Sequence, residues 1–143
     1  MQKLLIPVDG SESSLRAVDH VIKLAKGKED VMVTLLYVHL APEQYGAVAG
    51  QLTAEDIKEL EEKHADAVLA EPAKRLEAAG LRVERDFRVA VEIAPMISKR
   101  AEELGCDAIY MGAHGGGSLA RILVGSTANK VLHLSRVPVT LVK

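Results

Sequence analysis

Glycine and hydroxyl residues gather between positions 111 and 127 in a spacing that suits the binding of an anion. The stretch reads Met-Gly-Ala-His-Gly-Gly-Gly-Ser-Leu-Ala-Arg-Ile-Leu-Val-Gly-Ser-Thr, and nine residues separate Gly115 from Gly125. Glycine lets the main chain turn sharply and come close to a phosphate. Hydroxyls and free N–H groups at the start of the next helix, at Ser126 and Thr127, would point their donors at the same place. The spacing predicts a phosphate site, with a glycine turn that binds no ligand as the alternative.

A second segment must contribute to any such site. A helix start favours an anion by only about 0.3–1 kcal/mol when it is exposed, which is too little to hold a nucleotide alone. Asp9 is the candidate, because it follows the apolar run 3–8 directly and precedes Gly10 and Ser11. The carboxyl end of a buried strand is where open α/β sheets place ligand contacts. The alternative for Asp9 is an Asx turn at the entry to a helix.

Apolar runs bounded by turn residues predict the strands that position these groups. We place strands at residues 3–8, 31–38, 81–89, 107–111 and 137–142, with Pro7 where no ladder hydrogen bond is needed. Apolar and polar residues alternate in 81–89, which is typical of an edge strand with one wet face. Pro138 likewise indicates an edge for 137–142.

Helical spacing fills the intervals between the strands. Helices are expected to begin near Ser11, Thr53, Val91 and Ser126. In the second of them, Thr53 and Asp56 form a variant of the capping signature. Its apolar stripe is expected at Ile57, Leu60, Ala67 and Val68, and Pro72 is expected to kink or break it.

Alternation of strands and helices predicts a single α/β domain over residues 1–143, a doubly wound five-stranded parallel sheet with helices on both faces. The two edge assignments support the strand order 3-2-1-4-5. In that order the topological switch point falls between strands 1 and 4. Asp9 and Gly112, far apart in the chain, are therefore expected at one crevice.

Composition excludes several classes of protein. With 48% hydrophobic and 27% charged residues, the chain is expected to be folded and soluble. A net charge of −2 without a basic block argues against nucleic acid as a partner. No apolar segment is long enough for membrane insertion or a signal peptide, so we expect a cytoplasmic protein. Cys106, the single cysteine, excludes an internal disulfide and is interpreted as a small core residue.

The motif resembles that of the universal stress protein family, whose ATP-binding members carry Gly-x2-Gly-x9-Gly-(Ser/Thr). Gly112, Gly115, Gly125 and Ser126 match it, and residues 7–12 resemble the family's first strand and turn. The resemblance covers essentially the whole chain and implies an adenine nucleotide alpha hydrolase-like fold. The site residues that it implies are Pro7, Val8, Asp9, Val38, Met111, Gly112, His114, Gly115, Gly125, Ser126 and Thr127.

The resemblance also implies a role for each residue. Val8 and Asp9 would face ribose and adenine, Val38 would bind the adenine edge through its main chain, and Met111 would pack near the nucleoside. The phosphates would be surrounded by Gly112, His114, Gly115, Gly125, Ser126 and Thr127.

One position departs from the family pattern. Gly116 stands where relatives often carry Arg or Lys, so a cation that would balance the phosphates is absent there. Arg121 or Lys130 could replace it, although each is also typical of a solvated surface charge. The other histidines, His20, His39, His64 and His133, lack metal-ligand spacing, so no protein-built metal site is expected. Any Mg²⁺ would arrive bound through the phosphates of ATP.

The function expected first is an ATP-binding regulatory protein of the stress response, acting as a nucleotide-dependent switch. The alternatives are a slow ATPase or other nucleotide-dependent enzyme, and a dimerising module without nucleotide. Enzymatic turnover is disfavoured because the Walker A Lys-Ser/Thr pair is missing. A homodimer is expected through the edge strand Val137 to Val142, and an unidentified regulatory protein partner is compatible with a switch.

Overall fold

The computed structural model describes residues 1–41, 52–114 and 124–143. Its strands are β1 (Gln2–Pro7), β2 (Val31–Leu40), β3 (Arg82–Ala90), β4 (Ala108–Gly112) and β5 (Val139–Val142). Its helices are α1 (Glu12–Ala25), α2 (Ala54–Ala78), α3 (Ile93–Glu103) and α4 (Ser126–Leu134). All strands pair in parallel in the order β3-β2-β1-β4-β5, which confirms the predicted topology and both predicted edges.

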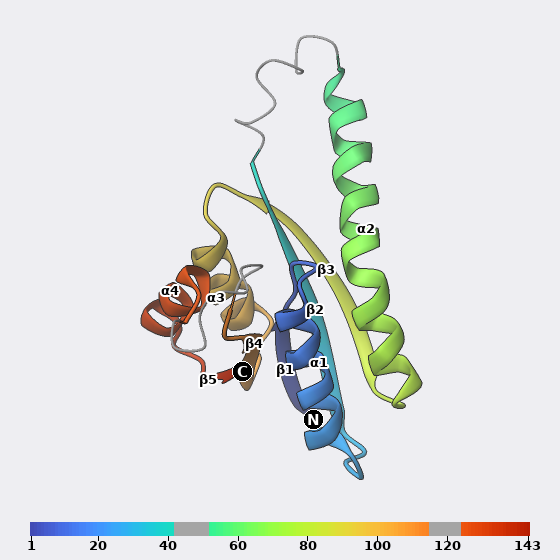
Figure 1. Cartoon of the computed structure of the whole chain (residues 1–143), viewed down its shortest axis with the longest axis vertical. Helices are drawn as coiled ribbons and strands as arrows, with labels where there is room; N and C mark the ends of the chain where they lie inside the picture. The colour runs from blue at the N-terminus through green and yellow to red at the C-terminus, as the bar shows by residue number, and fades with distance from the viewer. Residues whose placement is uncertain (42–51, 115–123) are drawn as a thin grey trace.

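Helices cover both faces of the sheet, and each face has its own apolar cluster (Figure 1). The first cluster joins α1 and α2 to one face, and the second joins α3 and α4 to the other. β1 shows how one strand serves both clusters. Leu4 and Ile6 belong to the first cluster and Leu5 to the second, because successive side chains leave a strand on opposite sides.

The predicted helix starts are confirmed at α1 and α2. Ser11 caps α1, and its Oγ accepts the N–H of Ser14 at 3.2 Å. At α2, Thr53 and Asp56 form a reciprocal capping box, each side chain accepting the other's backbone N–H at 3.1 Å. Such caps satisfy N–H groups that have no partner within the helix.

The structure shows that Pro72 does not end α2 and that the predicted buried stripe was wrong. The helix runs through Pro72 without a break, although proline removes one helical hydrogen bond and costs about 3 kcal/mol in a helix interior. Pro72 lies on the buried side of α2 together with Leu69, Ala73 and Leu76, and burial of this side on the sheet is a favourable term that opposes the cost of the proline. The buried stripe also differs from the expected one, since Leu60 is 54% exposed.

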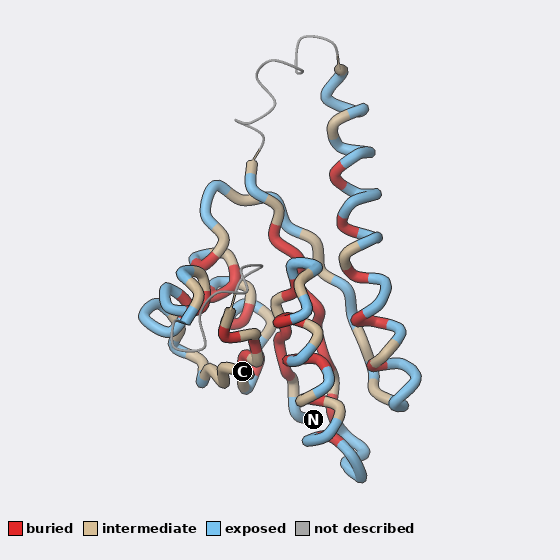
Figure 2. The backbone as a smooth tube through the Cα atoms, viewed as in Figure 1, coloured by how far each residue is buried: buried red, intermediate tan, exposed pale blue. Residues whose placement is uncertain are grey.

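The buried side of α2 follows residues Glu61, Ala65, Leu69, Pro72, Ala73 and Leu76. Figure 2 shows these as red bands along one side of a helix whose other residues are exposed or intermediate, with the amino-terminal turns of α2 extending beyond the sheet. Because few residues in these amino-terminal turns are buried, the spacing of apolar residues did not identify the face of α2 that packs on the sheet. Within the described residues, no helix is long and apolar enough to cross a membrane.

Candidate functional site

β1 and β4 are paired over a short stretch that stops before the carboxyl end of either strand. β1 pairs with β2 from Gln2 to Pro7, but its register with β4 comprises only Leu4 with Ala108 and Leu5 with Ile109. On the β2 side the ladder continues, with the Val8 N–H donating to the Leu36 carbonyl at 2.9 Å. Backbone groups alternate sides along a strand, so the Pro7 nitrogen faces β4 beyond the end of their pairing. The predicted switch point is therefore where two neighbouring parallel strands part.

Asp9 lies at the exit of β1 and adopts the Asx turn that was its alternative interpretation. Its Oδ1 accepts the N–H of Ser11 at 2.9 Å. Gly10 between them has φ of 86°, a backbone conformation that favours glycine. The carboxylate is exposed, so contact with a ligand would be a second role in addition to shaping the entry to α1.

The exit of β4 lies directly against the first turn of α1. The His114 N–H donates to Ser13 Oγ at 3.2 Å, across 101 positions of sequence. A Cβ on Gly112 would lie 2.7 Å from both the carbonyl carbon and the carbonyl oxygen of Ser13, and closer still to its Oγ. Gly112 is required by this approach of the protein's own backbone. Sequence reasoning missed Ser13, for which the only signal was its place in a first helical turn.

The start of α4 is attached to the same exit. The Gly125 N–H donates to the Ala113 carbonyl at 2.6 Å, and the Ala113 N–H donates to the Val142 carbonyl of β5 at 2.9 Å. Gly125 is the N-cap of α4 and brings no side chain to cap its first turn. The fold therefore brings the described parts of the glycine motif together, with Ser126 and Thr127 at the helix start. Gly115, Gly116 and Arg121 lie outside the described residues.

Val38 and Met111 belong to the apolar cluster beneath α3 and α4, where they are 8% and 6% exposed. β2 extends past β1, because Leu36 is the last residue of β2 in their register. The Leu36 carbonyl points toward β1, so the N–H and C=O of Val38, two residues on, point the same way. The main chain of Val38 thus faces the switch point beyond the end of β1, and its side chain supports the core.

Other candidate groups lie elsewhere. Lys130 is exposed on α4. Cys106 is buried in the second cluster, and this burial raises the pKa of its thiol, in agreement with a core residue. The fold brings together His39 and His64, whose ring centroids lie 6.1 Å apart. In the part of the chain that the structure describes, no three His, Cys, Asp or Glu residues form a group that could hold a metal ion.

Comparison with known proteins agrees with this architecture. The universal stress protein family matches residues 1–143. Universal stress protein MJ0531 of Methanocaldococcus jannaschii is 32% identical over 142 residues, which cover 99% of this chain and 82% of that protein. The solved structure of MJ0577, from the same organism, is 32% identical with a TM-score of 0.84, covering 99% of this chain and 95% of its own.

A universal stress protein solved in complex with cAMP is 25% identical to this chain and has a TM-score of 0.73. The similarity covers 99% of this chain and 97% of that one. The matches to the family, to the relative and to the solved structures thus extend over nearly the full length of this chain. The chain belongs to the universal stress protein family.

Proposed function

We propose that this protein is an ATP-binding regulatory protein of the stress response, in which bound nucleotide acts as a switch. The observation that carries the proposal is the hydrogen bond from the Gly125 N–H to the Ala113 carbonyl. It holds the start of α4 at the exit of β4, beside the point where β1 and β4 part. Helix-start N–H groups and a strand exit at a switch point are together suited to phosphates. The family member solved with cAMP supports an adenine nucleotide as the ligand.

The nucleoside end of the ligand would lie across the ends of β1 and β2. The main chain of Val38 faces this place, and Pro7, Val8 and Asp9 end β1 beside it. Met111 would support the nucleoside from β4. Around the phosphates we place Gly112, His114, Gly115, Gly125, Ser126 and Thr127. The residues present fit a nucleotide that spans from β2 to α4, and Mg²⁺ would be held through its phosphates.

A regulatory protein of this kind would bind its protein partners differently when nucleotide is bound and when it is not. We propose that residues 1–143 form one domain that acts in the cytoplasm as a homodimer through Val137 to Val142. Ile109 donates to the Pro138 carbonyl and Ala113 to the Val142 carbonyl. The backbone groups of Val139 and Leu141 therefore point away from β4, where they are oriented to pair with a second copy.

The proposal is tested by calorimetric titration of ATP into the wild type and a Ser126→Asp variant. An acidic residue at a helix start is favourable for the helix but repels phosphate at the same place. Like charges about 4 Å apart near a surface repel by several kcal/mol before screening. We expect the affinity for ATP to fall by at least about tenfold while the melting temperature holds.

Gln2→Glu is the matched control, because it adds the same charge at the amino end of the central strand β1, whereas the proposed site lies at the carboxyl ends of the strands. The affinity of this variant for ATP should stay within about twofold of the wild-type value. Equal affinity in the wild type and Ser126→Asp would refute the phosphate position. Turnover of ATP near the roughly 10 per second of typical enzymes would refute a switch in favour of an enzyme.

A further inference from the structure

We infer that Ser13 is a positioning residue of the nucleotide site, holding the exit of β4 in the geometry that the phosphates require. This inference rests on the proposed function. Ser13 is 4% exposed and lies in the first turn of α1. Its Oγ accepts the N–H of His114, the last described residue before the central part of the glycine motif.

The contact is fixed from the side of α1 by a short series of hydrogen bonds. Asp9 Oδ1 accepts the N–H of Ser11, and Ser11 Oγ accepts the N–H of Ser14. The Ser14 hydroxyl also donates to the Ser11 carbonyl at 2.9 Å, but the two bonds that fix the helix start have backbone N–H donors and do not need it. These bonds define the helix start, so the position of Ser13 follows from the exit of β1. Through Ser13, the exit of β1 determines where the chain leaves β4.

Gly112 makes this contact possible. Because a Cβ there would lie within 2.7 Å of the Ser13 carbonyl, only glycine lets β4 and α1 approach closely enough for the His114 N–H to reach Ser13 Oγ. The first glycine of the motif thus serves the internal contact between α1 and β4. Its effect on phosphate binding would be indirect, through the direction in which the chain leaves β4.

The chain offers a matched pair of serines for the test. Ser13 and Ser14 are 4% and 5% exposed, adjacent, and in the same helical turn. Ser13 Oγ contacts the exit of β4, whereas Ser14 Oγ bonds within its own helix start. Ser13→Ala and Ser14→Ala remove the same atom from the same environment. A positioning role therefore predicts different results, and a general loss of packing predicts similar ones.

The experiment titrates each variant with ATP and with adenosine, and follows amide hydrogen exchange at His114 by NMR without nucleotide. For Ser13→Ala we expect ATP affinity to fall about three- to tenfold, typical of one hydrogen bond, with adenosine affinity within about twofold of wild type. Exchange at the His114 amide should accelerate by at least about tenfold. Ser14→Ala should match the wild type in all three measurements.

The outcomes separate the positioning role of Ser13 from the proposed binding of ATP. Unchanged ATP affinity in Ser13→Ala, with ATP bound by the wild type, would overturn the inference and leave the proposed function standing. Equal losses for ATP and adenosine would also overturn it, because they indicate a structural role. Failure of the wild type to bind ATP would overturn the function and the inference together, even if exchange at His114 responds as expected.

Discussion

The two edges of the sheet are built from opposite kinds of residue. On one side of β3, alternate positions carry Arg82, Glu84, Asp86 and Arg88, whereas β5 reads Val-Thr-Leu-Val, has no charge and is half-buried throughout. Charged side chains protect an exposed strand edge from pairing with another chain. The difference indicates that β3 is protected against association and that β5 is suited to it.

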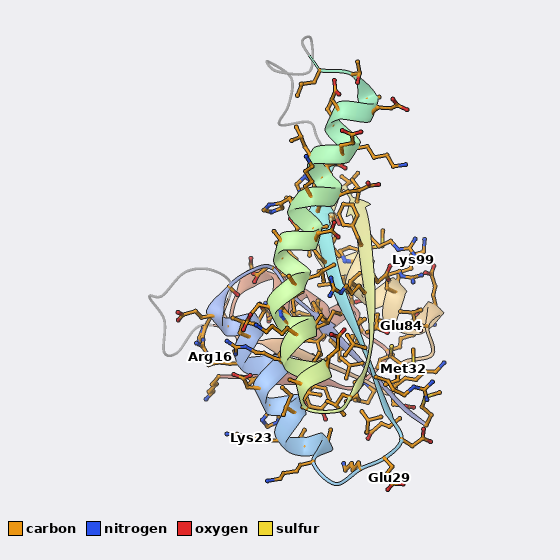
Figure 3. All side chains as sticks on the ribbon, turned by 90° about the vertical axis from the view of Figure 1, so that its right-hand side faces the viewer. Arg16, Lys23, Glu29, Met32, Glu84 and Lys99 are labelled. Atoms are coloured by element: carbon orange, nitrogen blue, oxygen red, sulfur yellow. The ribbon has the colours of Figure 1, made fainter. Side chains whose placement is uncertain are left out.

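The charges of β3 also attach the strand to the rest of the protein. Arg100 of α3 donates to Asp86 Oδ2 and to Glu103 Oε2, each at 2.7 Å, and Arg88 reaches Asp86 Oδ1 at 2.9 Å. The side chains of Arg100 and Asp86 are each 13% exposed. In Figure 3, the labelled Glu84 and Lys99 lie on the same outer side of the molecule, on β3 and α3. Asp86 and Arg88 of the charged edge are therefore held by contacts within the chain.

The largest effect should come from charging the apolar edge. Thr140→Lys places like charges near the two-fold axis of the proposed pairing, which costs several kcal/mol at an interface. Thr140 suits the test because Val139 and Leu141 pack against the second cluster. We expect the dimer dissociation constant, measured by analytical ultracentrifugation, to rise about 100-fold. Val89→Lys on β3 is the control, and a wild type that is monomeric at micromolar concentration would contradict the interface.

A smaller effect should follow from breaking the ion-pair cluster that holds β3. Asp86→Asn removes the charge that Arg100 and Arg88 share, with little change of shape. Hydrogen bonds to charged groups contribute about 1.5–3 kcal/mol, and because the amide retains part of that, we expect unfolding by urea to show a loss of about 1–2 kcal/mol. Glu84→Gln, exposed on the same side of β3, should change stability by less than about 0.5 kcal/mol. Equal losses in both variants would show that the cluster contributes nothing specific.

The smallest effect concerns pH. The hydrogen bond from Arg100 lowers the pKa of Glu103 below its ordinary value of 4.5. The pKa of Arg100 is raised in turn. Burial acts to lower the pKa of this guanidinium, but its hydrogen bonds to Asp86 and Glu103 raise it. A lowered carboxylate pKa contributes stability that is present above 4.5 and is lost as the pH falls through the pKa of the folded state.

The check is the stability difference between wild type and Glu103→Gln, measured in urea at several pH values. We expect a small difference at neutral pH that disappears below the lowered pKa of Glu103. A difference that grows on acidification would show that the sign of this linkage is wrong. Glu62→Gln, which removes an exposed carboxylate of α2, is the matched control for the loss of one negative charge.

The sequence predicted the topology well because strand burial is encoded locally. Buried strands such as 31–38 read as continuous apolar runs, the alternation in 81–89 marked an edge, and parallel strands separated by helices leave few orders open. The Ser11 and Thr53 caps were likewise readable, since their partners lie within a few residues. What failed was α2, where the position of the sheet decided which stripe is buried and whether Pro72 is tolerated.

The sequence by itself determined the fold class, the strand order and the segments that meet at the switch point, because each depends on periodicity and on residues close together in the chain. Only the tertiary structure decided that Gly112 makes room for Ser13, that Gly125 bonds to Ala113, and that His39 lies beside His64. These contacts join segments distant in the chain. The physical reason is that close approach depends on the packing distance between elements, which no local pattern specifies.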